Sequence, residues 1–123
     1  MNSIVLIAIV EDDRAVRDGI DNLVRSFGFQ TCRYSSAESY LDSDHAADVD
    51  CLITDVQMSG MSGLDLQRLL CARGGAPPII IVTASAQADI VAQAMTGGAI
   101  ACLHKPFDDA LLFHSIEQAL ALR

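Results

Sequence analysis

Short apolar runs alternate with stretches of helical periodicity along the whole chain, and this alternation restricts the fold more than any other feature. The first run, Ile4–Val10, is apolar at every position, which is typical of a strand covered on both faces. From Asp13 to Gly28 the apolar residues recur at helical spacing instead, as Val16, Ile20, Leu23, Val24 and Phe27. Further strands are predicted over 30–34, 51–55, 79–83 and 99–105.

Start and stop signals predict helices between these strands. Ser35 followed by Glu38 has the spacing of a capping box, so we expect a helix that begins there and buries Ala37, Tyr40 and Leu41. The remaining helices are predicted after Gly63, over 87–95 and after an N-cap at Asp108. Five strands alternating with five helices, in a chain of 123 residues, predict one α/β domain with a parallel sheet and helices on both faces.

The composition excludes several classes of function. Sixteen acidic side chains stand against eight Lys and Arg, which gives a net charge of −8, so this domain itself is expected to bind no nucleic acid. The longest apolar run is too short to span a membrane, and the first residues lack the features of a signal peptide. We therefore expect a cytoplasmic protein with no membrane contact. The four cysteines form no C-x-x-C pair, which favours free thiols.

Polar residues stand where four of the predicted strands end. Glu-Asp-Asp at 11–13 follows the first strand, Asp55 and Thr83 end the third and fourth, and Lys105 ends the fifth. The functional site of a doubly wound sheet lies at the carboxyl ends of its strands, so we expect these side chains to meet in one pocket. Clustered carboxylates suit Mg²⁺, and Asp55 can act as a nucleophile towards phosphorus. Thr83 and Lys105 can hold phosphate oxygens.

Simpler explanations account for some of the polar residues. Acids near a helix start are favoured by the helix dipole, which explains one acid after the first strand better than three. Asp13 is expected to be such a helix-capping acid. His104 is expected to be an exposed strand residue, and His45 and His114 lack the spacing of metal ligands. These four residues are therefore assigned no part in the site.

Six short segments occur in order at the predicted strand ends: Val10-Glu-Asp-Asp13, Ile53-Thr-Asp55-Val-Gln-Met58, Gly63-Leu-Asp-Leu66, Ile81-Val-Thr83-Ala84, Gly98-Ala99 and Lys105-Pro106-Phe107. With this set the chain resembles, over its whole length, the response-regulator receiver domains of two-component systems. Within that family, Gly28-Phe29, Ser36-Ala37-Glu38 and Leu41 resemble the FixJ-type receivers. The resemblance implies a CheY-like, flavodoxin-like fold, in which five parallel strands in the order 2-1-3-4-5 are flanked by five helices.

The resemblance also implies a role for the acidic residues. Asp55 would accept a phosphoryl group from the phosphohistidine of a sensor histidine kinase. Asp12, Asp55 and the backbone carbonyl of Gln57 would bind Mg²⁺, and Glu11 would act through a water. The domain would not be an enzyme for other substrates, because it would support only its own phosphorylation and dephosphorylation.

The remaining implied roles concern what happens after phosphorylation. Thr83 would follow the phosphoryl group and Lys105 would bind it, with a cis peptide after Lys105. Ser59 departs from the family pattern, which usually has a proline there, so the loop is expected to be less restrained. Cys102 occupies the switch position, where the family commonly has a Tyr or Phe that swings inward. We therefore expect the signal to travel through a rearrangement of Ala84–Met95.

The main prediction is a phosphorelay receiver over residues 1–123. By likeness to FixJ-type proteins, a C-terminal helix-turn-helix domain outside this chain would contact DNA and make the output transcriptional, and phosphorylation would favour a homodimer. The alternative is a pseudo-receiver, a protein-interaction module that does not use phosphate, and Cys102 is its only support. A Mg²⁺-dependent hydrolase is disfavoured, because the acids after the first strand are contiguous rather than D-x-D-x-T and no P-loop motif occurs.

Overall fold

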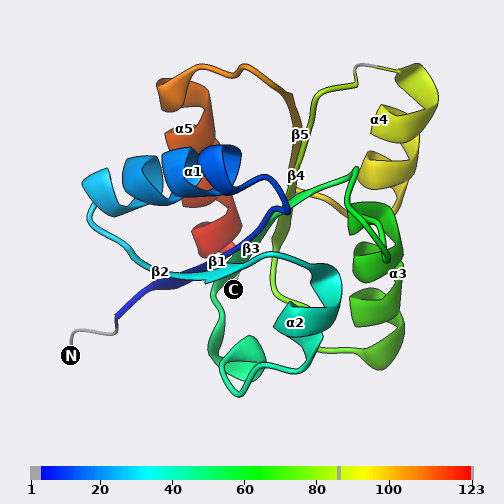
Figure 1. Cartoon of the computed structure of the whole chain (residues 1–123), viewed down its shortest axis with the longest axis horizontal. Coiled ribbons are helices and arrows are strands. Elements are labelled where there is room, and N and C mark those ends of the chain that lie inside the picture. Colours follow the sequence, from blue (N-terminus) through cyan, green and yellow to red (C-terminus); the bar gives the residue numbers. More distant parts are fainter. Residues whose placement is uncertain (1–3, 86, 123) are drawn as a thin grey trace.

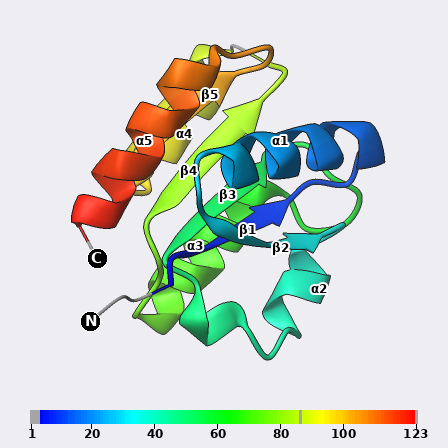
Figure 2. The same ribbon diagram turned by 90° about the vertical axis from the view of Figure 1, so that its left-hand side faces the viewer.

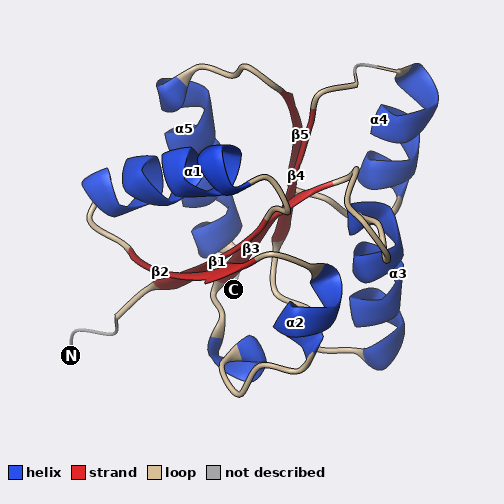
Figure 3. Cartoon of the chain, in the orientation of Figure 1, coloured by secondary structure: helices blue, strands red, loops and turns tan. Residues whose placement is uncertain are grey.

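The computed structural model describes residues 4–85 and 87–122, and it has the predicted alternation of strands and helices (Figure 3). The strands are β1 (Leu6–Val10), β2 (Gln30–Tyr34), β3 (Cys51–Asp55), β4 (Ile79–Thr83) and β5 (Ala101–His104). The helices are α1 (Arg14–Ser26), α2 (Ala37–Leu41), α3 (Gly63–Arg73), α4 (Ala88–Thr96) and α5 (Asp109–Ala121), with a 3₁₀ turn, η1, at Ala46–Asp48. None of the helices in the described part of the chain has the length and hydropathy that crossing a bilayer requires.

The five strands form one parallel sheet in the order β2-β1-β3-β4-β5, as predicted. Parallel neighbours need a crossover connection, and here each crossover contains a helix. Figure 1 shows α1 and α5 on one side of the sheet and α2, α3 and α4 on the other. The turned view in Figure 2 shows α1 and α5 lying over the same face. The fold is therefore a three-layer, doubly wound α/β domain.

Both faces of the sheet are packed, because successive strand residues point to opposite sides. The core beneath α1 and α5 combines strand and helix side chains that include Ile7, Ile9, Ile53, Val82, Ile20, Val24, Leu112 and Ile116. The core beneath α2, α3 and α4 includes Ala8, Val10, Leu52, Ile81, Tyr40, Leu66 and Ala94. This two-sided burial explains why the central strands are continuous apolar runs rather than alternating ones.

Several predicted element boundaries differ slightly from the structure. β1 begins two residues later than predicted, at Leu6, whose N–H donates to the carboxylate of Asp50 (2.9 Å). β5 also begins two residues late, because the N–H of Ala99 donates to the carbonyl of Ala94 (3.0 Å) and closes the end of α4. β5 ends one residue early, and α4 is displaced by one residue from its predicted range.

The capping box predicted at Ser35 is wrong. The N-cap of α2 is Ser36, whose hydroxyl oxygen accepts the N–H of Ser39 (3.0 Å). Glu38 does not fold back onto the start of the helix. Its carboxylate accepts the N–H of Met61 (3.0 Å), in the loop after β3. Adjacent serines make the local pattern ambiguous, and a long-range contact takes the glutamate that the capping box needs.

Helix α3 starts directly against the end of β3. The hydroxyl oxygen of Ser62 caps the helix by accepting the N–H of Asp65 (3.1 Å). The N–H of Gly63 donates to the carbonyl of Val56 (3.0 Å). A Cβ at Gly63 would stand 2.0 Å from the carbonyl oxygen of Asp55, which is far inside van der Waals contact. The junction therefore requires glycine because the backbones approach closely.

Gly63→Ala is expected to lower the free energy of unfolding by about 2 kcal/mol, because the added methyl group must push β3 and α3 apart. Gly19→Ala is the control, since Gly19 lies inside α1 and nothing stands within 4 Å of its Cβ position. The control should gain up to about 1 kcal/mol from the better helix propensity of alanine. Urea unfolding followed by circular dichroism measures both, and equal effects would contradict a tight junction.

Candidate functional site

The register of the sheet brings together the acids that follow β1 and end β3. Val10, the last residue of β1, pairs with Thr54, which precedes Asp55 in β3. Glu11 and Asp12 therefore leave β1 beside Asp55, because neighbouring parallel strands end at the same edge. One carboxylate oxygen from each of these three acids lies within 4.8 Å of the other two. We call Glu11, Asp12 and Asp55 the acid cluster.

Lys105 reaches the acid cluster from the end of β5. Its ammonium nitrogen, Nζ, lies 3.0 Å from Glu11 Oε1 and 3.1 Å from Asp55 Oδ2. It is the only lysine of the chain, and its side chain is 19% exposed. The peptide between Lys105 and Pro106 is cis, as predicted. One lysine thus bridges carboxylates from two different strands.

Glu11 is the most enclosed acid of the cluster, with 1% of its surface exposed. Its Oε1 accepts from Lys105, and its Oε2 accepts the N–H of Asp13 (3.1 Å). Burial raises the pKa of the Glu11 carboxyl above 4.5, and the hydrogen bonds from Asp13 and Lys105 offset only part of this rise. The guanidinium of Arg17 donates to the backbone carbonyl of Glu11 (2.9 Å) and holds the turn after β1 in place.

The same contacts keep Lys105 charged. Burial by itself would lower the pKa of Lys105, but the hydrogen bonds to Glu11 and Asp55, together with their negative charges, outweigh burial. The pKa of Lys105 therefore lies above its usual value. The site consequently contains one fixed positive charge against three carboxyl groups.

The two carboxylate oxygens of Asp55 have different surroundings. The residue is 5% exposed, and Oδ2 accepts from Lys105. Oδ1 is buried and has no hydrogen-bond partner among the described residues. A buried polar atom without a partner is unfavourable and calls for a ligand. Oδ1 is therefore the atom of the acid cluster that is best placed to meet a cation or an incoming electrophile.

Two carboxylates hold the loop between β3 and α3 beside the acid cluster. Ser59 donates its N–H to Asp12 Oδ2 (3.1 Å), and Met61 donates its N–H to Glu38 Oε2 (3.0 Å). A proline at position 59 could not make the first bond, because proline has no N–H. Ser59 thus restrains the loop in a different way from the fixed φ of proline. Gln57 lies exposed in this loop, and metal binding by its carbonyl stays a prediction.

The other predicted residues lie on β4 and β5. Thr83 is buried at the end of β4, and its Oγ1 accepts the N–H of Ser85 (3.0 Å). Cys102 is half-buried and packs against the core beneath α3 and α4, outside the acid cluster, where burial raises the pKa of its thiol. His104 is exposed, as predicted, and its Nε2 lies 3.0 Å from the carbonyl oxygen of Ala84. The roles of Thr83 and Cys102 stay predictions.

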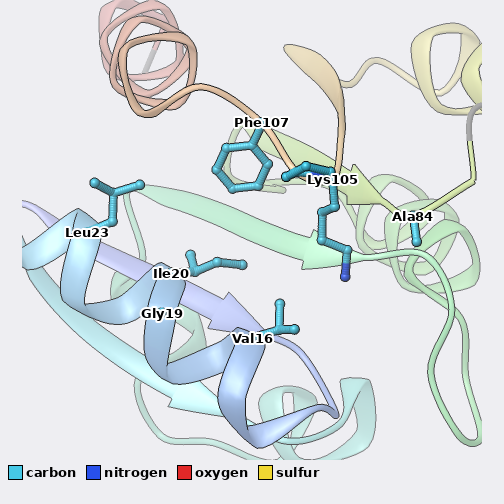
Figure 4. Close-up of a pocket in the computed structure, with 8 residues that line it drawn as sticks. Val16, Gly19, Ile20, Leu23, Ala84, Lys105 and Phe107 are labelled. Atoms are coloured by element: carbon cyan, nitrogen blue, oxygen red, sulfur yellow. The ribbon is translucent and has the colours of Figure 1, made fainter.

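An apolar groove of about 520 Å³ opens beside the acid cluster (Figure 4). It is lined by α1 and by the segments that follow β4 and β5, through Val16, Gly19, Ile20, Leu23, Ala84, Lys105, Pro106 and Phe107. In Figure 4, Phe107 faces Ile20 and Leu23 across the groove, and the ammonium of Lys105 lies at its edge. The groove therefore joins an apolar surface to the charged site.

The sequence reasoning missed three residues that support the site. Arg17 holds the turn at Glu11, Glu38 holds the loop after β3, and Gly63 allows α3 to start against β3. Only Gly63 could have been singled out from the sequence, because it lies between a predicted strand that ends in Asp55 and a segment of helical periodicity. Two expectations about other residues are confirmed: Asp13 caps α1 through the N–H of Val16 (3.0 Å), and the four cysteines are free thiols.

The fold and the site define a class of protein: a doubly wound α/β domain with a lysine-bridged acid cluster at the carboxyl edge of its sheet. The response regulator receiver domain family matches residues 7–117, and the chain belongs to this family. The predicted resemblance is thereby confirmed.

Individual relatives point to the FixJ-like group within the family. The transcriptional regulatory protein FixJ of Azorhizobium caulinodans is 37% identical over 112 residues, which cover 91% of this chain and 53% of that protein. The response regulator protein TmoT of Ectopseudomonas mendocina is 39% identical over 117 residues, covering 95% and 53%. The crystal structure of FixJ-N has a TM-score of 0.87 at 32% identity, covering 98% of this chain and 96% of that chain. The chain thus spans about half the length of the curated relatives that it matches.

Lys105→Met is expected to lower the free energy of unfolding by about 3 kcal/mol at about pH 7, because it leaves two buried carboxylates without their counter-charge. Lys105 lowers the pKa of Glu11, so its loss should raise that pKa further. A carboxyl group whose pKa is higher in the folded protein than in the unfolded chain, where it is 4.5, binds a proton more readily in the folded state. The folded variant therefore gains stability as the pH falls towards 4.5. The difference from the wild type should therefore shrink at lower pH.

Arg68→Met is the control for this substitution. Arg68 pairs with Asp65 at 2.6 Å, but both side chains are more than half exposed. Its loss should cost less than about 1 kcal/mol, because exposed ion pairs contribute little. Urea unfolding at two pH values measures both variants. A Lys105→Met effect as small as that of the control, or one that grows at low pH, would contradict a stabilising bridge.

Proposed function

We propose that this chain is a phosphorelay receiver in which Asp55 accepts a phosphoryl group from a sensor histidine kinase. The environment of Asp55 carries this proposal. The residue is buried at a strand end, Lys105 holds Oδ2, and Oδ1 lacks a hydrogen-bond partner within 4–85 and 87–122. Such an oxygen can attack phosphorus without first giving up another contact.

The acid cluster supports Mg²⁺ as the cofactor of this reaction. Its three carboxylates bring hard oxygen ligands within 4.8 Å of one another, and such ligands suit Mg²⁺. Asp12 and Asp55, with the backbone carbonyl of Gln57, would hold the ion, and Glu11 would act through a water. The bound ion would neutralise charge on the incoming phosphoryl group.

The transfer needs only a few groups of the chain. An oxygen of Asp55 forms a bond to phosphorus while the bond from phosphorus to the donor imidazole nitrogen breaks, and the electron pair of that bond stays on the nitrogen. Lys105 would then pair with one phosphoryl oxygen as a point charge, and the hydroxyl of Thr83 would donate to another. Water would later hydrolyse the acyl phosphate, so that the domain acts on no substrate other than its own aspartate.

The surroundings of the site support a protein partner and a transcriptional output. The groove beside Lys105 has the apolar lining that a helical partner needs, so we assign it to the kinase. The relatives named as transcriptional regulators are much longer than this chain, which matches about half of each. This length supports a C-terminal helix-turn-helix domain that contacts DNA, and a homodimer that forms on phosphorylation.

Incubation with acetyl phosphate and Mg²⁺ tests the proposal. The intact mass should rise by one phosphoryl group, and chelation of Mg²⁺ or Asp55→Asn should abolish the rise, because the first removes the cation and the second the nucleophile. Asp13→Asn is the control, since Asp13 caps α1 and lies outside the acid cluster. Asparagine caps helices as well as aspartate, so this variant should be labelled like the wild type.

The pseudo-receiver alternative predicts a different result. A protein-interaction module that does not use phosphate would gain no mass at any Mg²⁺ concentration. A gain that persists in Asp55→Asn would place the acceptor on another residue. Either result would contradict the proposal for Asp55.

A further inference from the structure

Two hydrogen bonds hold the start of the loop between β4 and α4. Within the loop, Thr83 Oγ1 accepts the N–H of Ser85 (3.0 Å). From β5, His104 Nε2 lies 3.0 Å from the carbonyl oxygen of Ala84. A carbonyl oxygen can only accept, so His104 must donate, and its imidazole must carry a proton on Nε2. Ala86, in the same loop, lies outside the described residues.

The backbone connects His104 to the acid cluster. His104 pairs with Thr83 in the register of β4 and β5, and the N–H of Lys105 donates to the carbonyl of Thr83 (2.8 Å). Lys105 in turn holds Asp55. Residues two apart in a strand share a face of the sheet, so His104 lies on the same face as Cys102, the face covered by α3 and α4. The imidazole of His104 therefore links β5 to the loop on the face of the sheet where Cys102 stands in place of an aromatic residue.

Helix α4 is lightly packed. Ala94 is its only fully buried residue, Ile90 in its first turn is partly buried against the core, and the N-cap residue Gln87 makes no side-chain capping bond. Near its other end, Gln67 Nε2 donates to the carbonyl of Ala94 (2.9 Å) and anchors α4 to α3. Elements with few buried side chains open at low free-energy cost. The start of α4 is therefore held less firmly than its end, where Ala94 is buried and bonded to Gln67.

We propose that His104 is a positioning residue for the β4–α4 loop. Its bond to the carbonyl of Ala84 holds Ala84, and with it Thr83 and Ser85, in the conformation described above. This inference rests on the proposed function in one respect only, which is that phosphorylation of Asp55 is the event that moves the loop. When the hydroxyl of Thr83 turns towards a phosphoryl group on Asp55, it leaves Ser85, and the bond from His104 still ties the loop to β5. His104 thereby limits how far phosphorylation displaces α4.

Hydrogen–deuterium exchange of peptides covering Ala84–Met95 tests this role. In unphosphorylated protein, His104→Ala should exchange roughly five-fold faster than the wild type in this segment, which is the effect of losing one exposed hydrogen bond. Acetyl phosphate with Mg²⁺ should then change exchange more in the variant than in the wild type, because the bond that limits the displacement of the loop is gone. His104→Gln should restore wild-type protection, since the amide N–H₂ of glutamine can donate to the same carbonyl.

The control is His114→Ala, which removes an exposed imidazole from α5 and should leave exchange in this segment unchanged. Unaltered exchange in His104→Ala, or fast exchange in His104→Gln, would overturn the inference. The exchange rates of unphosphorylated wild type and His104→Ala are compared without phosphate. This comparison therefore tests the role of His104 even if Asp55 accepts no phosphoryl group. A normal phosphoryl adduct with unaltered exchange in His104→Ala would overturn the role of His104 and leave that of Asp55 intact.

Discussion

The bridge from Lys105 to Glu11 Oε1 and Asp55 Oδ2 determines how the carboxyl edge of the sheet is arranged. The parallel register leaves no alternative place for the acids, because they follow strands that end side by side. Buried carboxylates this close repel one another, and a single ammonium cancels only part of their charge. The remaining negative charge at Asp12 and Asp55 is what suits the edge to the proposed cation and phosphoryl group.

The backbone around this edge is fixed by contacts that come from distant parts of the chain. Arg17 holds the turn after β1, Glu38 holds the loop after β3, and the missing side chain of Gly63 lets α3 begin against Asp55. None of these residues takes part in the proposed chemistry. Each one limits the movement of a loop that carries a reacting group, and such preorganisation is what phosphoryl transfer requires of a protein.

The two sides of the site differ in how firmly they are held. Glu11 and Asp55 extend from β1 and β3, two central strands that are packed on both faces. Thr83 leads instead into a loop whose tie to β5 is the exposed bond from His104 to Ala84, and α4 beyond it buries only Ala94. A signal that leaves the site is therefore expected on the α4 side, where less packing has to be disrupted.

The sequence by itself determined the number and order of the elements, the two-sided burial of the strands and the positions of the acids, the threonine and the lysine at strand ends. These features follow from backbone geometry, since the periods of strands and helices are local. The family resemblance added the strand order, which no local pattern contains. Tertiary structure alone decided that Lys105 bonds both Glu11 and Asp55, that Glu38 serves a loop rather than its own helix, and that His104 reaches Ala84. Such contacts join residues far apart in the chain, and they depend on strand register and side-chain rotamers, which are settled only when the whole core packs.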